Sequence, residues 1–131
     1  MRYRIKDLRG IPNHHWRILE NAHIRYVDML IPADLTDLSY KTHLARDRLE
    51  LYRDLALLIQ IPRLGPVNAI ILTKPEINIR SIAALARADP QQIYEKMRKI
   101  QFKYKFSKSA PRLSIIEAWI HAAQRINLQE S

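Results

Sequence analysis

Glycine is scarce in this chain, which has two glycines among 131 residues. Glycine adopts positive φ angles without steric cost, and it makes up about 7% of average sequences. We therefore expect left-handed backbone at Gly10 and Gly65 and at almost no other position. Each glycine stands in a short break between stretches whose apolar residues recur at helical spacing. The chain should accordingly fold as helices joined by short turns.

The sequences around the two glycines are similar, which indicates an internal repeat. The copies align when Gly10-Ile11-Pro12 is placed opposite Arg63-Leu64-Gly65, and the second copy then needs two extra residues. The matched positions are Trp16 with Ala69, Leu19 with Leu72, and, after the insertion, Ile24-Arg25-Tyr26-Val27 with Ile79-Arg80-Ser81-Ile82. Ser81 can cap the helix that follows it, whereas Tyr26 cannot, so the helix of the first copy should start less firmly.

The apolar spacing predicts a single all-α domain. Two hairpin repeats, about residues 4–38 and 55–101, are joined by one long helix over about residues 40–60. A C-terminal helix follows over about residues 111–127, and both Trp16 and Trp119 are interpreted as core residues. The segment FKYKF at 102–106 has a period of two, so it is either a short strand or an extended connector.

The second break resembles the helix-hairpin-helix pattern, in which two helices flank a loop built around Gly-apolar-Gly. Ile61-Pro62-Arg63-Leu64-Gly65-Pro66 carries this resemblance, with Ala69 and Leu72 at the usual apolar positions of the second helix. Arg63 stands where the first loop glycine usually sits. The first copy keeps Gly10 and Ile11 but has Pro12 in place of the second glycine.

From Leu55 to Ile126 the order of motifs is similar to a prokaryotic family with tandem hairpins, which is catalogued as a domain of unknown function. The motifs that follow the second hairpin are Ile79-Arg80-Ser81-Ile82-Ala83-Ala84-Leu85-Ala86, Asp89-Pro90, Ala110-Pro111-Arg112-Leu113 and Ile116-Glu117-Ala118-Trp119-Ile120. With the first copy, the resemblance covers nearly the whole chain and implies a compact tandem helix-hairpin-helix (SAM-like) fold. Hairpins of this superfamily serve as DNA-backbone binders and as protein adaptors, photosynthetic subunits among them, so function stays open.

Positive charge is concentrated in one segment of the sequence. The formal net charge is +9, and residues 96–112 contain seven basic side chains and no acidic one. Such a segment favours a polyanionic partner, with nucleic acid as the leading candidate. The aromatic residues of FKYKF could stack on unpaired bases or pack inward. An acidic protein or an anionic membrane surface would suit the same charges.

The family resemblance implies which residues would contact nucleic acid. In DNA-binding hairpins, amides at the start of the second helix bind a phosphate, and the helix dipole adds to the attraction. In the second hairpin the candidates are Arg63, Leu64, Gly65, Asn68 and Lys74. In the first hairpin they are Gly10, Asn13 and Arg17, and the missing amide of Pro12 makes this the weaker site. The basic segment adds Lys99, Lys103, Lys105 and Lys108.

Nothing in the sequence favours catalysis. The chain lacks cysteine and has no nucleophile elbow, phosphate-binding loop or metal-binding helix motif. Asp47, Glu50 and Asp54 share a helix face with Arg46 and Arg53, which predicts surface ion pairs rather than a cation site. We expect no enzyme activity, cofactor or metal. With neither a signal peptide nor an apolar span, we expect a cytoplasmic protein.

Two functions remain open from the sequence. The first is a non-catalytic module that binds the nucleic-acid backbone without sequence specificity, DNA more readily than RNA. The second is a structural or adaptor subunit of a larger protein assembly, in which the hairpins contact protein and the positive charge faces an acidic partner.

Overall fold

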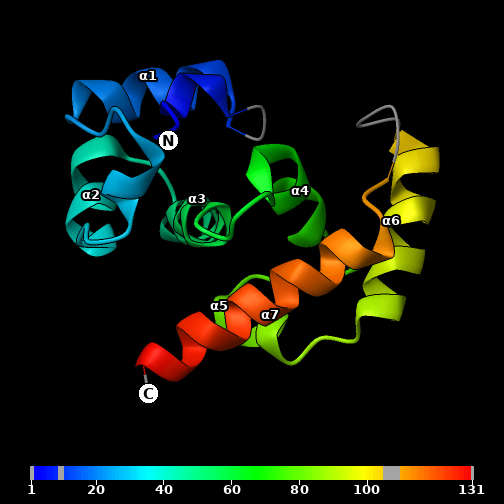
Figure 1. Ribbon diagram of the computed structural model, residues 1–131. Helices are drawn as coiled ribbons and strands as arrows, with labels where there is room; N and C mark the ends of the chain where they lie inside the picture. Colours follow the sequence, from blue (N-terminus) through cyan, green and yellow to red (C-terminus); the bar gives the residue numbers. More distant parts are fainter. Residues whose placement is uncertain (1, 9–10, 105–109, 131) are drawn as a thin grey trace. The chain divides into compact units, whose positions relative to one another are not determined.

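The computed structural model describes the backbone of residues 2–8, 11–104 and 110–130, and their side chains except at 102–104 and 129–130. Over these residues the chain forms seven α-helices, two 3-10 helices and no strand, so it is all-α as predicted (Figure 1). The chain divides into two compact units, Met1–Leu57 and Leu58–Ser131. In the described part, none of the helices combines the length and apolar character of a membrane span.

The first unit is built from short helices around an aliphatic core. Its elements are η1 (Ile5–Asp7), α1 (Asn13–Asn21), η2 (Val27–Leu30), α2 (Leu35–Thr42) and α3 (Arg46–Ile59), whose last residues belong to the second unit. Its core includes Ile5, Leu19, Leu30 and Leu49, all with no exposed surface. The His15 Nδ1 atom of α1 lies 2.7 Å from the hydroxyl oxygen of Tyr52 on α3, and Tyr52 is fully buried.

The single helix predicted over about residues 40–60 is interrupted near its start. α2 ends at Thr42, and His43 follows with a φ of 62°. The Thr42 hydroxyl donates to the Leu38 carbonyl and accepts from the Leu44 amide, while the Ser39 hydroxyl donates to the Leu44 carbonyl. These side chains satisfy backbone groups in the turn, so the chain re-enters a helix only at Arg46. The ion pair between Arg46 and Glu50 has the predicted spacing.

The second unit packs its helices around Trp119. Its elements are α4 (Gly65–Leu72), α5 (Ile82–Ala86), α6 (Pro90–Tyr104) and α7 (Leu113–Glu130). α7 lies across α5 and α6, and α4 contacts α6 (Figure 1). Trp119, Leu72, Leu85 and Ile116 have no exposed surface, and the Trp119 Nε1 atom has no hydrogen-bond partner among the described residues.

Part of the FKYKF segment is helical. Residues 102–104 continue α6, so the prediction of a strand or extended connector is wrong for them, and 105–106 lie outside the described residues. The buried seam of Ile93, Met97 and Ile100 holds α6 against its unit. No glycine or proline interrupts the sequence between Pro90 and Pro111. The helical spacing of the apolar residues in α6 therefore determines the conformation of residues 102–104, rather than the alternation of aromatic residues and lysines in FKYKF.

A hydrogen bond joins matching residues after α1 and after α4, across five residues in the first copy of the repeat and seven in the second. The Ile24 amide donates to the Leu19 carbonyl at 2.9 Å, and the Ile79 amide donates to the Leu72 carbonyl at 2.8 Å. The preceding residues, His23 and Asn78, both have left-handed backbone, with φ angles of 69° and 55°. These pairs have the register that the sequence alignment predicts.

The expectation that only glycines take positive φ angles is wrong. Gly65 has a φ of 76°, but four other described residues are also left-handed, namely His23, His43, Arg63 and Asn78. Asparagine and histidine are enriched among residues with left-handed backbone, so His23, His43 and Asn78 can adopt this conformation although they are not glycines. Gly10 lies outside the described residues.

Candidate nucleic-acid interface

A tight turn leads into α4. The Leu64 amide donates to the Ile61 carbonyl at 3.2 Å across Pro62 and Arg63. Proline in the second position and a positive φ in the third are the features of a type II turn. Arg63 has a φ of 66°, so it takes the backbone conformation expected of the glycine that it replaces.

The space beside Gly65 is open. Gly65 has a φ of 76°, and a Cβ atom added there would meet nothing within 4 Å. The side chains of Pro62 and Arg63 on the preceding turn are exposed, whereas Leu64 is buried. A ligand could therefore approach the main chain at this point without displacing a side chain.

α4 begins without a capping side chain. Its N-cap residue is Leu64, which offers no side-chain acceptor to the first-turn amides. α1, the matching helix of the first copy, begins in the same way after Pro12. In contrast, Asp34 accepts from two amides of α2, and Ser81 accepts from the Ala84 amide of α5. The two hairpin helices thus leave early amides to water or a ligand.

Most of the net charge belongs to the second unit. Residues 58–131 contain 12 basic and 5 acidic side chains, a net +7 of the total +9. The four ion pairs of Arg2, Arg4, Lys41 and Arg46 all lie in the first unit. Several exposed cations of the second unit form no ion pair with a described acidic side chain. They are Arg63, Arg87, Lys96, Arg98, Lys99, Arg112 and Arg125.

Comparison with known protein families identifies the chain. Residues 9–126 match the family described as Domain of unknown function (DUF4332). The chain belongs to the DUF4332 family. The match spans parts of both units and confirms the family resemblance seen in the sequence. No curated protein and no solved structure matches the chain significantly.

The structure describes all the predicted contacts of the second hairpin of this DUF4332 chain. Arg63 is exposed, while buried Leu64 offers only its main chain. The Asn68 side chain is committed to the loop, because its Nδ2 atom donates to the Leu64 carbonyl at 2.7 Å. Lys74 is half-buried.

The first hairpin is described only in part. Asn13 accepts a hydrogen bond from Trp16 Nε1 at 3.1 Å, and the Arg17 guanidinium lies 5.4 Å from the centre of the Trp16 ring. Trp16 is half-buried, so its interpretation as a core residue is wrong. The pattern gives this position to alanine, and the larger indole of Trp16 reaches Asn13 on the same helix.

The basic segment is likewise described in part. Lys99 is exposed on α6, as are its neighbours Lys96 and Arg98, and Arg98 lies 5.5 Å from the centre of the Tyr94 ring. The backbone of Lys103 belongs to the last turn of α6. Lys105 and Lys108 lie outside the described residues.

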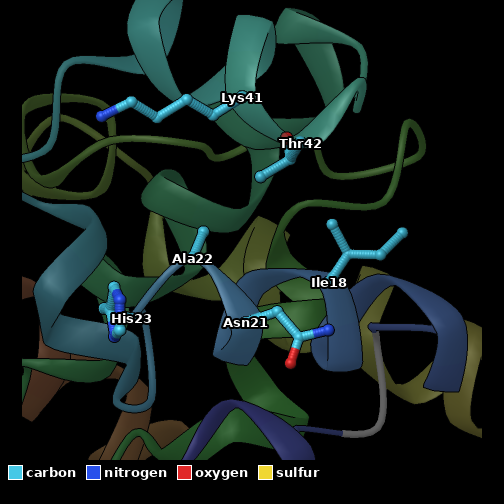
Figure 2. Close-up of a pocket in the computed structure, with 6 residues that line it drawn as sticks. All are labelled: Ile18, Asn21, Ala22, His23, Lys41 and Thr42. Atoms are coloured by element: carbon cyan, nitrogen blue, oxygen red, sulfur yellow. The ribbon is translucent and has the colours of Figure 1, made fainter.

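The sequence did not indicate a hollow in the first unit of the DUF4332 chain. It has a volume of about 400 Å³ and lies between the C-terminal ends of α1 and α2 (Figure 2). Its lining consists of Ile18, Asn21, Ala22, His23, Lys41 and Thr42. The Lys41 ammonium pairs with Asp37, and the Thr42 hydroxyl already makes two hydrogen bonds. Asn21 and His23 supply the other polar side chains of the lining.

Metal ligands do not gather in the described part of the chain. No group of three or more histidine, aspartate or glutamate side chains could hold an ion there. In the second unit, the exposed cations and the uncapped start of α4 are features that suit an anionic ligand.

Proposed function

We propose that the protein is a non-catalytic cytoplasmic module that binds the sugar-phosphate backbone of nucleic acid, DNA in preference to RNA, without reading its sequence. The observation that carries this proposal is the start of α4. There, an uncapped helix follows an open turn with an exposed arginine, whereas α2 and α5 are capped by their own side chains.

The chemistry of a helix start suits a phosphate group. Early amides point along the helix axis, and the helix dipole places partial positive charge at this end. Pro66 has no amide, so Gly65 and Val67 would supply the first donors of α4. Losing one such hydrogen bond costs about 1 kcal/mol, which a few charge contacts can offset.

The charge of the second unit supports binding over a longer range. Each lysine or arginine that neutralises a phosphate releases condensed counterions, so affinity should fall steeply with added salt. Such contacts do not depend on the bases. The exposed Lys96, Arg98 and Lys99 on α6 share a unit with the α4 turn and carry no competing ion pair with a described acidic side chain.

Fluorescence anisotropy with labelled duplex and single-stranded DNA tests the proposal. Binding through two or three phosphates should weaken roughly 10- to 40-fold between about 50 and about 200 mM salt, and scrambled sequences should bind equally. RNA of the same length provides the comparison between nucleic acids. A folded sample that binds neither form of DNA at low salt would end the proposal.

Lys99→Gln provides the first variant. It should weaken DNA binding and reduce the slope of log affinity against log salt by about 1, because one counterion-releasing contact is lost. Lys6→Gln removes one exposed charge from the first unit and serves as the matched control. Equal weakening by both variants would indicate a nonspecific charge effect and contradict a site on the second unit.

A pull-down with and without nuclease distinguishes the adaptor function. A stoichiometric protein partner that resists nuclease, together with no DNA binding, would support an adaptor instead. Co-purifying nucleic acid that nuclease removes would support the proposed function.

A further inference from the structure

Among the described residues with left-handed backbone, Arg63 is the residue whose type is unusual for that conformation. His23, His43 and Asn78 belong to residue types that are enriched in this region, and arginine does not. The φ of 66° at Arg63 is imposed by the turn, in which the third residue must be left-handed. An L-residue meets steric repulsion there from its own Cβ atom, which glycine lacks.

The Arg63 side chain lacks any interaction with a described residue that would stabilise this backbone conformation. Its side chain is exposed, and within the described residues it makes no hydrogen bond, ion pair or ring contact. Arg46, an exposed arginine of the first unit, bonds to Glu50 instead. No interaction of Arg63 inside the described chain offsets the steric cost of its backbone.

We propose that Arg63 occupies this glycine-type position because its guanidinium binds a phosphate of the nucleic-acid backbone. This inference rests on the proposed function and deepens it by assigning the principal charged contact to one residue. The planar guanidinium can donate two parallel hydrogen bonds to phosphate oxygens, which a lysine ammonium cannot do. The open space beside the next residue, Gly65, leaves room for that phosphate.

Arg63→Gly separates folding from binding. Its urea midpoint should equal or exceed that of the wild type, because relief of the steric cost outweighs the added freedom of glycine in the unfolded chain. DNA affinity at low salt should fall by roughly tenfold, and the slope of log affinity against log salt should drop by about 1. Arg63→Lys should keep the wild-type slope but bind several-fold more weakly.

Two matched variants control for backbone and charge. Asn78→Gly changes another exposed left-handed position of the same unit, and Arg125→Gln removes another exposed charge of that unit. Both should bind DNA within twofold of the wild type.

The outcomes distinguish the two proposals. A wild type that binds DNA while Arg63→Gly binds equally well would overturn the role of Arg63 and leave the proposed function standing. A clear loss of stability in Arg63→Gly would show that the side chain serves the fold, which also overturns this inference. A wild type that does not bind DNA would remove both proposals.

Discussion

The imidazole of His15 is held in a position that disfavours its charged form. Its Nδ1 atom lies 2.7 Å from the Tyr52 hydroxyl, and its ring packs edge-on against His14 and Tyr52. Desolvation, followed by the charges of His14 and Arg48, lowers the pKa of His15 below the ordinary value of 6.5. Desolvation also raises the pKa of buried Tyr52. At neutral pH both groups are uncharged, and the neutral imidazole can accept from the hydroxyl.

Acidification should therefore destabilise the protein through His15. The unfolded chain binds a proton at this residue more readily than the folded chain, so stability is lost as pH falls through 6.5 toward the lowered pKa. Urea midpoints measured between about pH 7 and about pH 5 should decrease for the wild type and decrease less for His15→Gln.

His121→Gln is the control for this experiment, because His121 is exposed on α7. It should keep the pH dependence of the wild type. If His15→Gln and the wild type lose stability in parallel, another group is responsible.

The left-handed residues mark the limit of sequence reasoning at this scale. The hairpin pattern aligned Arg63 with a glycine, and the structure gives it the φ of that glycine. His43 carried no such signal, because its conformation depends on how Ser39 and Thr42 bond to Leu44. A local pattern cannot foresee hydrogen bonds of this kind, since the same residues also suit a continuous helix.

Among the helices, capping separates the two copies of the repeat. Ser81 accepts from the Ala84 amide at 3.0 Å, and α5 follows as an α-helix. At the matching position Tyr26 provides no cap, and only the 3-10 helix η2 follows. The sequence predicted this difference, because capping depends on a single local residue type.

Ser81→Ala should lower the free energy of unfolding by about 1 kcal/mol, the usual effect of removing a serine cap. Urea denaturation monitored by circular dichroism provides the measurement. Ser81→Thr should retain most of the stability, since threonine also caps.

Ser114→Ala controls for the loss of a hydroxyl. Ser114 is the exposed second residue of α7, and alanine has a high helix propensity, so little change is expected. A Ser81→Ala variant as stable as Ser114→Ala would show that the cap contributes nothing.

At the scale of the whole molecule, charge is divided unevenly between the two units. The first unit has 10 basic and 8 acidic side chains, with ion pairs at Arg2, Arg4, Lys41 and Arg46, while the second carries a net +7. Salt screens both attraction and repulsion between exposed charges. It should weaken the ion pairs of the first unit and relieve repulsion within the second.

Hydrogen exchange measured by mass spectrometry can test this difference. Raising sodium chloride from about 10 to about 200 mM, across which the Debye length shortens severalfold, should increase protection in peptides from residues 58–131 more than in peptides from residues 1–57. The comparison is internal, so each unit serves as the control for the other. An equal response would contradict the role given to charge repulsion.

The candidate interface was predictable only in outline. The glycine-centred break and the basic segment could be read from the sequence, because both depend on composition and short spacing. The uncapped start of α4 and the engagement of Asn68 with the Leu64 carbonyl could not, since they depend on the geometry of the turn. The position of Trp16 was also missed, because burial depends on neighbours distant in sequence.

The indole of Trp119 is sealed from water, and its nitrogen has no acceptor in the part of the chain that the structure describes. Its fluorescence should consequently be emitted at short wavelength for as long as the surrounding helices hold together. Because Trp119 is buried and is not among the residues assigned to the ligand, a bound oligonucleotide should leave its emission maximum unchanged. In a Trp16→Phe variant, in which Trp119 is the remaining tryptophan, a red shift during a titration would therefore report denaturation and would check the integrity of the sample.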